Sequence, residues 1–94
     1  MRLDNVQKAA LEKAIRNVNG DVYLFGSRVD DSKKGGDIDI LIFSEENPFK
    51  LSQKVSIDFF MECEEKIDVT VMNPHRLTDE QRAFLDVITM EKIK

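Results

Sequence analysis

The segments LFGS at residues 24–27 and DIDILIF at residues 37–43, separated by nine residues, decide how this 94-residue chain folds. Each contains a short apolar run of the length that is typical of a buried strand. Because strand side chains alternate between two faces, Asp37 and Asp39 point to the same face. Adjacent carboxylates repel each other unless a cation lies between them, and Asp oxygens are the hard ligands that Mg²⁺ prefers. This spacing therefore predicts a metal site.

Gly26 and Ser27 end the first of these apolar runs and predict a turn. Glycine allows the backbone to approach a ligand closely, because it has no side chain in the way. Free backbone amides at such a turn attract an anion, and phosphate is the anion we expect here. The two segments together predict a metal site beside a phosphate site.

Outside these segments, helical and strand patterns alternate along the chain. Asp4 with Gln7, and Thr78 with Gln81, have the spacing of a capping box and indicate two helix starts. A short helical turn is expected at Ser27. The periodicity of apolar residues predicts helices at 4–19, 48–65 and 78–93, and strands at 21–25, 37–43 and 66–72.

Asp68 is the third candidate acid, one residue into the last predicted strand. The long helical connection before it allows the second and third strands to lie parallel through a right-handed crossover. Asp68 then lies level with Asp37 and Asp39. The shorter loop between the first and second strands favours an antiparallel pair, which brings the Gly26-Ser27 turn beside the start of the second strand. We therefore expect these groups to meet at one edge of the sheet.

Length and composition limit the class of protein. At 94 residues, 41% of them hydrophobic and 34% charged, the chain is expected to form one domain over residues 1–94. No apolar run approaches the roughly 20 residues of a membrane helix, and the N-terminus is polar at once, so we expect a cytoplasmic protein. One cysteine excludes a disulfide within the chain and a cysteine-built metal cluster. A net charge of −4 argues against binding duplex nucleic acid and suits an inhibitor that docks on a basic partner.

Gly26-Ser27, Asp37-x-Asp39 and Asp68 within the run IDVTV at 67–71 together resemble the polymerase-beta superfamily of nucleotidyltransferases. More narrowly, the chain resembles the minimal nucleotidyltransferase (MNT) antitoxins of MNT/HEPN toxin–antitoxin pairs. The resemblance covers most of the chain, although the spacer has nine residues where ten is usual in the minimal group. It implies the α+β nucleotidyltransferase fold, α-β-α-β-α-β-α, with a small mixed three-stranded sheet and helices packed mainly on one face.

The same resemblance implies transfer of AMP from ATP to a hydroxyl, in these antitoxins a tyrosine of a HEPN ribonuclease toxin. Asp37 and Asp39 would hold two Mg²⁺ ions. Asp68 would bind only the ion that activates the hydroxyl and would accept its proton. Gly26, Ser27 and Arg28 would bind the phosphates of the nucleotide, with Lys33 and Lys34 as alternatives to Arg28.

Other interpretations remain open at this stage. Taken singly, each acid is as well explained by a solvated surface position. A non-catalytic antitoxin or nucleotide-binding module would neutralise its partner by stoichiometric contact, through a sheet face with Leu41 and Phe43 or a closing helix with Phe84 and Leu85. A small-molecule adenylyltransferase is less favoured, because no second domain encloses a substrate. Association with a second copy or with a toxin is expected.

Overall fold

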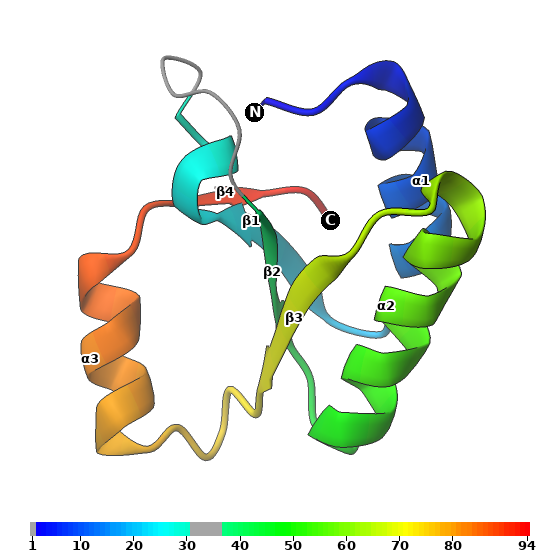
Figure 1. Ribbon diagram of the computed structural model, residues 1–94. Coiled ribbons are helices and arrows are strands. Elements are labelled where there is room, and N and C mark those ends of the chain that lie inside the picture. The colour runs from blue at the N-terminus through cyan, green and yellow to red at the C-terminus, as the bar shows by residue number, and fades with distance from the viewer. Residues whose placement is uncertain (1, 31–36) are drawn as a thin grey trace.

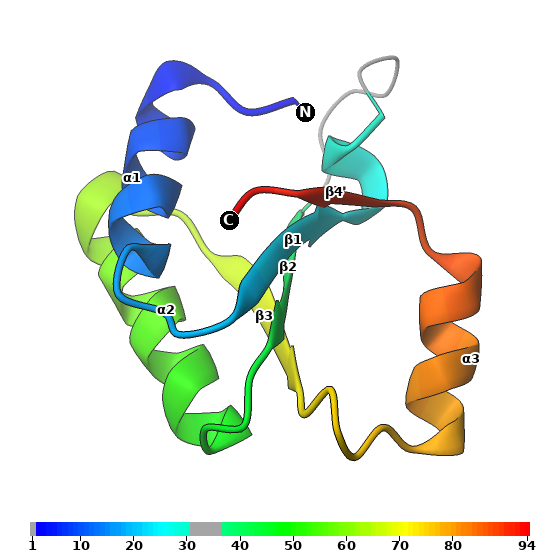
Figure 2. The same ribbon diagram turned by 180° about the vertical axis from the view of Figure 1, so that it is seen from behind.

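A computed structural model describes residues 2–30 and 37–94 and shows a mixed four-stranded sheet with helices on both faces (Figures 1 and 2). The strands lie in the order β3-β2-β1-β4. The elements in chain order are α1 (Asn5–Ile15), β1 (Asp21–Phe25), the 3-10 turn η1 (Gly26–Arg28), β2 (Ile38–Phe43), α2 (Pro48–Cys63), β3 (Ile67–Met72), α3 (Asp79–Val87) and β4 (Met90–Lys92).

The predicted α+β fold and strand directions are confirmed. β1 pairs antiparallel with β2, and β2 pairs parallel with β3. Both predicted capping boxes are formed, with Asp4 bonded to Gln7 and Thr78 bonded to Gln81. The helical turn expected at Ser27 is η1. No helix in the described part of the chain is both long and apolar enough to cross a membrane.

The prediction of one closing helix over residues 78–93 is wrong in its second half. α3 ends at Val87, Ile88 has an extended backbone, and residues 90–92 form β4. β4 pairs antiparallel with β1, so the sheet has four strands and not three. The physical reason is nonlocal: the free edge of β1 offers backbone hydrogen bonds that a continued helix would leave unmade.

The first helix is also shorter than predicted, since α1 ends at Ile15 and not at Asn19. The side chain of Lys94 donates hydrogen bonds to backbone carbonyls at the end of α1 and just after it. The ammonium group of Lys94 donates to the carbonyl oxygens of Ile15 and Arg16, both at 2.9 Å, and also to that of Val18. The C-terminal residue therefore caps the N-terminal helix.

Helices α1 and α2 lie side by side over one face of the sheet, and this layer holds the main core. Alternation along β2 directs Ile38, Ile40 and Ile42 into it, on the face opposite Asp39. Apolar residues of the two helices fill the rest, chiefly Ala10, Leu11, Ala14, Ile15, Leu51, Val55 and Phe59. The candidate site is therefore excluded from this face, because its acids alternate with the buried isoleucines.

Helix α3 lies on the opposite side of the sheet (Figures 1 and 2). The ring of Phe84 packs edge-on against that of Phe25 in β1, with 5.5 Å between centroids. Leu41 in the centre of this face is 0% exposed. Leu41 is therefore not accessible to a partner, whereas Phe43, predicted with it as a partner surface, is half-buried.

The Lys94 cap predicts a measurable contribution to stability. Lys94→Met leaves three carbonyls of the α1 end without their charged donor, and we expect the free energy of unfolding to fall by about 1 to 2 kcal/mol. Lys92→Met is the control, because Lys92 makes only an exposed ion pair with Asp21 at 3.3 Å, worth about 0.5 kcal/mol. Urea denaturation measures both, and equal losses would contradict the capping role.

Candidate active site

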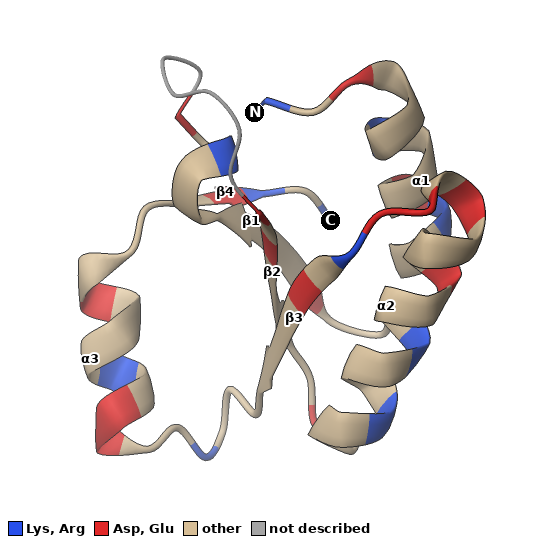
Figure 3. Cartoon of the chain, in the orientation of Figure 1, with Lys and Arg blue, Asp and Glu red and all other residues tan. Residues whose placement is uncertain are grey.

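Asp39 and Asp68 occupy neighbouring positions on β2 and β3. The parallel register pairs the two residues directly. Both lie on the face opposite the isoleucines, toward α3, and Figure 3 shows acidic residues on each of these strands. Asp37 comes immediately before β2, two residues from Asp39. The structure thus brings the three predicted acids to one end of the sheet.

Gly26 lies against the side chain of Asp39 from the other neighbouring strand. Phe25 is the register partner of Asp39, so Gly26 follows at the same end of the sheet. The φ of Gly26 is +78°, which favours glycine, and a β-carbon at this position would lie 2.6 Å from Asp39 Oδ2. A side chain at residue 26 would therefore displace the carboxylate or the turn.

The electrostatics of the site are those of three unneutralised carboxylates. Burial is the main cause that raises the pKa of Asp39, and the negative charges of Asp68 and Asp37 raise it further. Asp39 is half-buried, whereas Asp37 and Asp68 are exposed. A positive charge beside Asp39 would act against all three causes of its raised pKa.

The donor chemistry of these residues suits a hard divalent cation, since it consists of carboxylate oxygens. As they stand, no three His, Cys, Asp or Glu side chains within residues 2–30 and 37–94 form a group that could hold a metal ion. Carboxylates that lie close together repel one another unless a cation lies between them. The residues fit Mg²⁺ in kind, and its binding at Asp37, Asp39 and Asp68 stays a prediction.

The turn η1 carries the predicted phosphate-binding residues. Its backbone is held by hydrogen bonds from Val29 N to Gly26 O at 3.2 Å and from Asp30 N to Ser27 O at 3.3 Å. The N-terminal segment supports it from outside, since Arg2 Nη2 donates to Ser27 O at 3.4 Å. The turn is therefore fixed before any ligand arrives.

Arg28 is directed toward the N-terminal segment in this structure. Its Nη1 donates to Arg2 O at 3.1 Å and to Gln7 Oε1 at 3.3 Å. Its contact with a nucleotide stays a prediction, and Lys33 and Lys34 lie outside the described residues. Arg28 has a structural role that the sequence pattern did not indicate.

Gln7 links the turn to the strand that carries Asp68. It is 5% exposed, and its Nε2 donates to Glu65 Oε2 at 3.0 Å, two residues before β3. Its Oε1 meets Arg28, so one side chain joins η1 to the entrance of β3. The capping-box spacing revealed Gln7 as a helix start, but nothing in the sequence indicated this second role.

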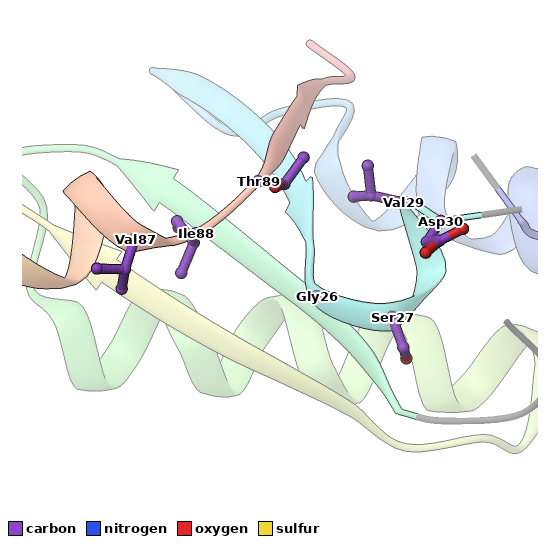
Figure 4. A pocket seen from close by; sticks show the side chains of 7 residues that line it. All are labelled: Gly26, Ser27, Val29, Asp30, Val87, Ile88 and Thr89. Atoms are coloured by element: carbon purple, nitrogen blue, oxygen red, sulfur yellow. The ribbon is translucent and has the colours of Figure 1, made fainter. Parts of the chain in front are cut away.

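A pocket of about 560 Å³ opens beside η1 (Figure 4). One wall consists of Gly26, Ser27, Val29 and Asp30. The other consists of Val87, the last residue of α3, and of Ile88 and Thr89 in the connection to β4. The second wall was missed at the level of sequence, because these residues had been assigned to a continuous helix. The predicted phosphate-binding turn therefore forms part of a larger cavity.

Comparison with known families agrees with this geometry. The family described as Polymerase beta, Nucleotidyltransferase matches residues 8–91, which is most of the chain and includes every residue of the predicted site. A search among curated proteins finds no match.

The contact between Gly26 and Asp39 predicts a coupled pair of substitutions. Gly26→Ala should cost about 1 to 2 kcal/mol for the left-handed backbone and an additional amount for the displaced carboxylate. In an Asp39→Ala background only the backbone cost remains. A double-mutant cycle by urea denaturation measures the difference, and an equal cost in both backgrounds would show that the two residues do not meet.

The repulsion among the acids predicts opposite effects with and without metal. Asp39→Asn removes a partly buried like charge, so we expect the metal-free protein to gain on the order of 0.5 kcal/mol. Mg²⁺ should raise the Tm of the wild type and leave that of the variant unchanged. Asp86→Asn, at an exposed acid of α3, is the control and should keep the Mg²⁺ response. An Mg²⁺ shift of equal size in Asp39→Asn would rule out this site.

Proposed function

The chain belongs to the polymerase beta nucleotidyltransferase family, and from this premise we propose that it transfers AMP from ATP to a tyrosine hydroxyl of a HEPN-type ribonuclease toxin. In this role the protein is the antitoxin of the pair. The observation that carries the proposal is the position of Asp39, which has Asp68 beside it on one strand and Gly26 against its carboxylate from the other.

We assign each acid a role according to its position relative to Asp39. Asp37, Asp39 and Asp68 would hold two Mg²⁺ ions, which when bound supply positive charge to the attacking and leaving oxygens of an in-line displacement. Asp68 is exposed at the edge strand β3, where it can accept the proton of an incoming hydroxyl. The hydroxyl oxygen forms a bond to the α-phosphorus, the bond from that phosphorus to the β-phosphate bridge breaks, and pyrophosphate leaves.

The phosphates of ATP are assigned to η1. Gly26 has no side chain and so permits close approach, and Ser27 offers its hydroxyl and backbone amide to the β- and γ-phosphates. The turn is already held in place by the N-terminal segment, which lowers the ordering cost of binding. Arg28 would add positive charge only if its side chain leaves Arg2 and Gln7.

A protein acceptor suits the openness of the site. Asp37 and Asp68 are exposed, so a side chain from another molecule can reach them. The acids do not line the pocket beside η1, which we assign to the nucleotide, so that pocket does not enclose a small acceptor next to them. AMP on a tyrosine would add bulk and negative charge at the toxin's RNA-cleaving site.

Intact mass spectrometry tests the proposal directly. Incubation of the protein with ATP, Mg²⁺ and its HEPN-type partner should increase the mass of the partner by one or more adenylyl groups. Asp39→Asn should lower the rate at least about a hundredfold, because it removes a charged metal ligand. Asp86→Asn is the control for charge and should retain the wild-type rate. No mass increase with the wild-type protein would contradict the proposal.

The alternative is a non-catalytic antitoxin that neutralises its partner by contact. Its support is a set of exposed apolar side chains on α2, which the sequence analysis had not selected: Phe49 at 69% exposure, Ile57 at 58%, Phe60 at 45% and Met61 at 75%. The two functions differ in the dose of antitoxin that is needed to stop RNA cleavage by the partner, which is measured after the same incubation. Neutralisation by Asp39→Asn at equimolar dose, with wild type also needing equimolar dose, would favour contact alone.

A further inference from the structure

We propose that Val87, Ile88 and Thr89 form the wall that receives the base and ribose of the nucleotide, so that the connection between α3 and β4 determines how the nucleoside is recognised. This inference rests on the proposed function, and it concerns a part of the site that no acidic or glycine motif marks. Val87, Ile88 and Thr89 line the pocket on the side across from the η1 turn (Figure 4).

The two walls have the two chemistries that a nucleotide needs. Gly26 and Ser27 present a backbone turn suited to phosphate. Val87 and Ile88 present apolar surface suited to a flat base. Asp30 also lines the pocket, on the same wall as Ser27. The order of groups therefore runs from phosphates at Gly26 to the base at the far wall.

The size of the pocket leaves room for the nucleoside part of ATP, while the α-phosphate would lie at its edge, because Asp39 contacts Gly26 but does not line the pocket. A volume of about 560 Å³ lies within the 300 to 1,000 Å³ that is usual for small-molecule sites. The far wall is therefore available to the part of ATP that extends beyond the phosphates.

The far wall is held at a fixed distance from the turn through Phe25. Phe25 directly precedes Gly26, its ring packs against Phe84 at 5.5 Å, and its backbone pairs with Met90. The wall residues lie between these two anchor points in the sequence, and Ile88 N donates to Phe84 O at 3.3 Å. The pocket is therefore formed before the ligand binds, which favours selective recognition.

Val87 offers a clean test because it is 80% exposed, and its replacement does not disturb the core. We would measure binding of ATP and of inorganic tripolyphosphate to the full chain by titration calorimetry with Mg²⁺ present. Wild type should bind ATP more tightly than tripolyphosphate. Val87→Asn should weaken ATP binding about five- to tenfold and leave tripolyphosphate binding unchanged, because only the nucleoside loses apolar contact. Val6→Asn is the matched control, at a valine of α1 that is 62% exposed and does not line the pocket.

The outcomes separate this inference from the proposed function. If Val87→Asn binds both ligands as wild type does, or if wild type binds ATP no better than tripolyphosphate, the nucleoside lies elsewhere and the inference is overturned while the transferase stands. An equal loss of both ligands in Val87→Asn would also overturn it, because the wall would then act on the phosphates. If wild type binds neither ligand, the proposed function fails together with the inference.

Discussion

The register of β2 places Asp39 between Asp68 on β3 and Gly26 at the end of β1. A shift of β2 by one residue against β3 would pair Asp39 with a core residue and turn Asp68 away, since alternate strand positions face opposite sides. The same shift against β1 would take the carboxylate away from Gly26. Every chemical role assigned to this end of the sheet depends on that one alignment.

The apolar face of β2 is strong enough to hold this alignment against the repulsion that it creates. Ile38, Ile40 and Ile42 are at most 3% exposed, and burial of each contributes about 1.5 to 3 kcal/mol. Two carboxylates about 4 Å apart near solvent repel by roughly 1 kcal/mol in water and about 4 kcal/mol at an effective dielectric constant of 20. Burial of the three isoleucines therefore exceeds the repulsion within one such pair of carboxylates. The hydrophobic pattern of the strand thus favours the alignment that brings the acids together.

This balance explains which features could be predicted from the sequence. Alternation along β2, the capping boxes at Asp4 and Thr78, and the crossover that aligns Asp68 are set by local pattern and connection length. β4 could not be predicted in the same way, because residues 90–92 become a strand only where the edge of β1 is free. The second wall of the pocket was missed for the same reason, because the predicted helix continued past Val87, where α3 ends, through Ile88 and Thr89. Polar contacts between residues far apart in the sequence, such as Gln7 to Glu65, were missed for a related reason. The fold brings the two side chains together, and the sequence shows no relation between them.

The turn η1 is held by contacts from segments far from it in the sequence. Arg2 and Arg28 exchange backbone and side-chain hydrogen bonds, and Gln7 carries the connection on to the segment before β3. Lys94 ties the other end of the chain to the end of α1. Both terminal segments thus stabilise elements on which the site depends, the N-terminal segment at the turn and the C-terminal one at the helix behind the sheet. Among the described residues the guanidinium of Arg28 serves this support, so the proposed function assigns the phosphates of a nucleotide to the backbone amides of η1 and to cations held by the acids at the start of β2 and β3.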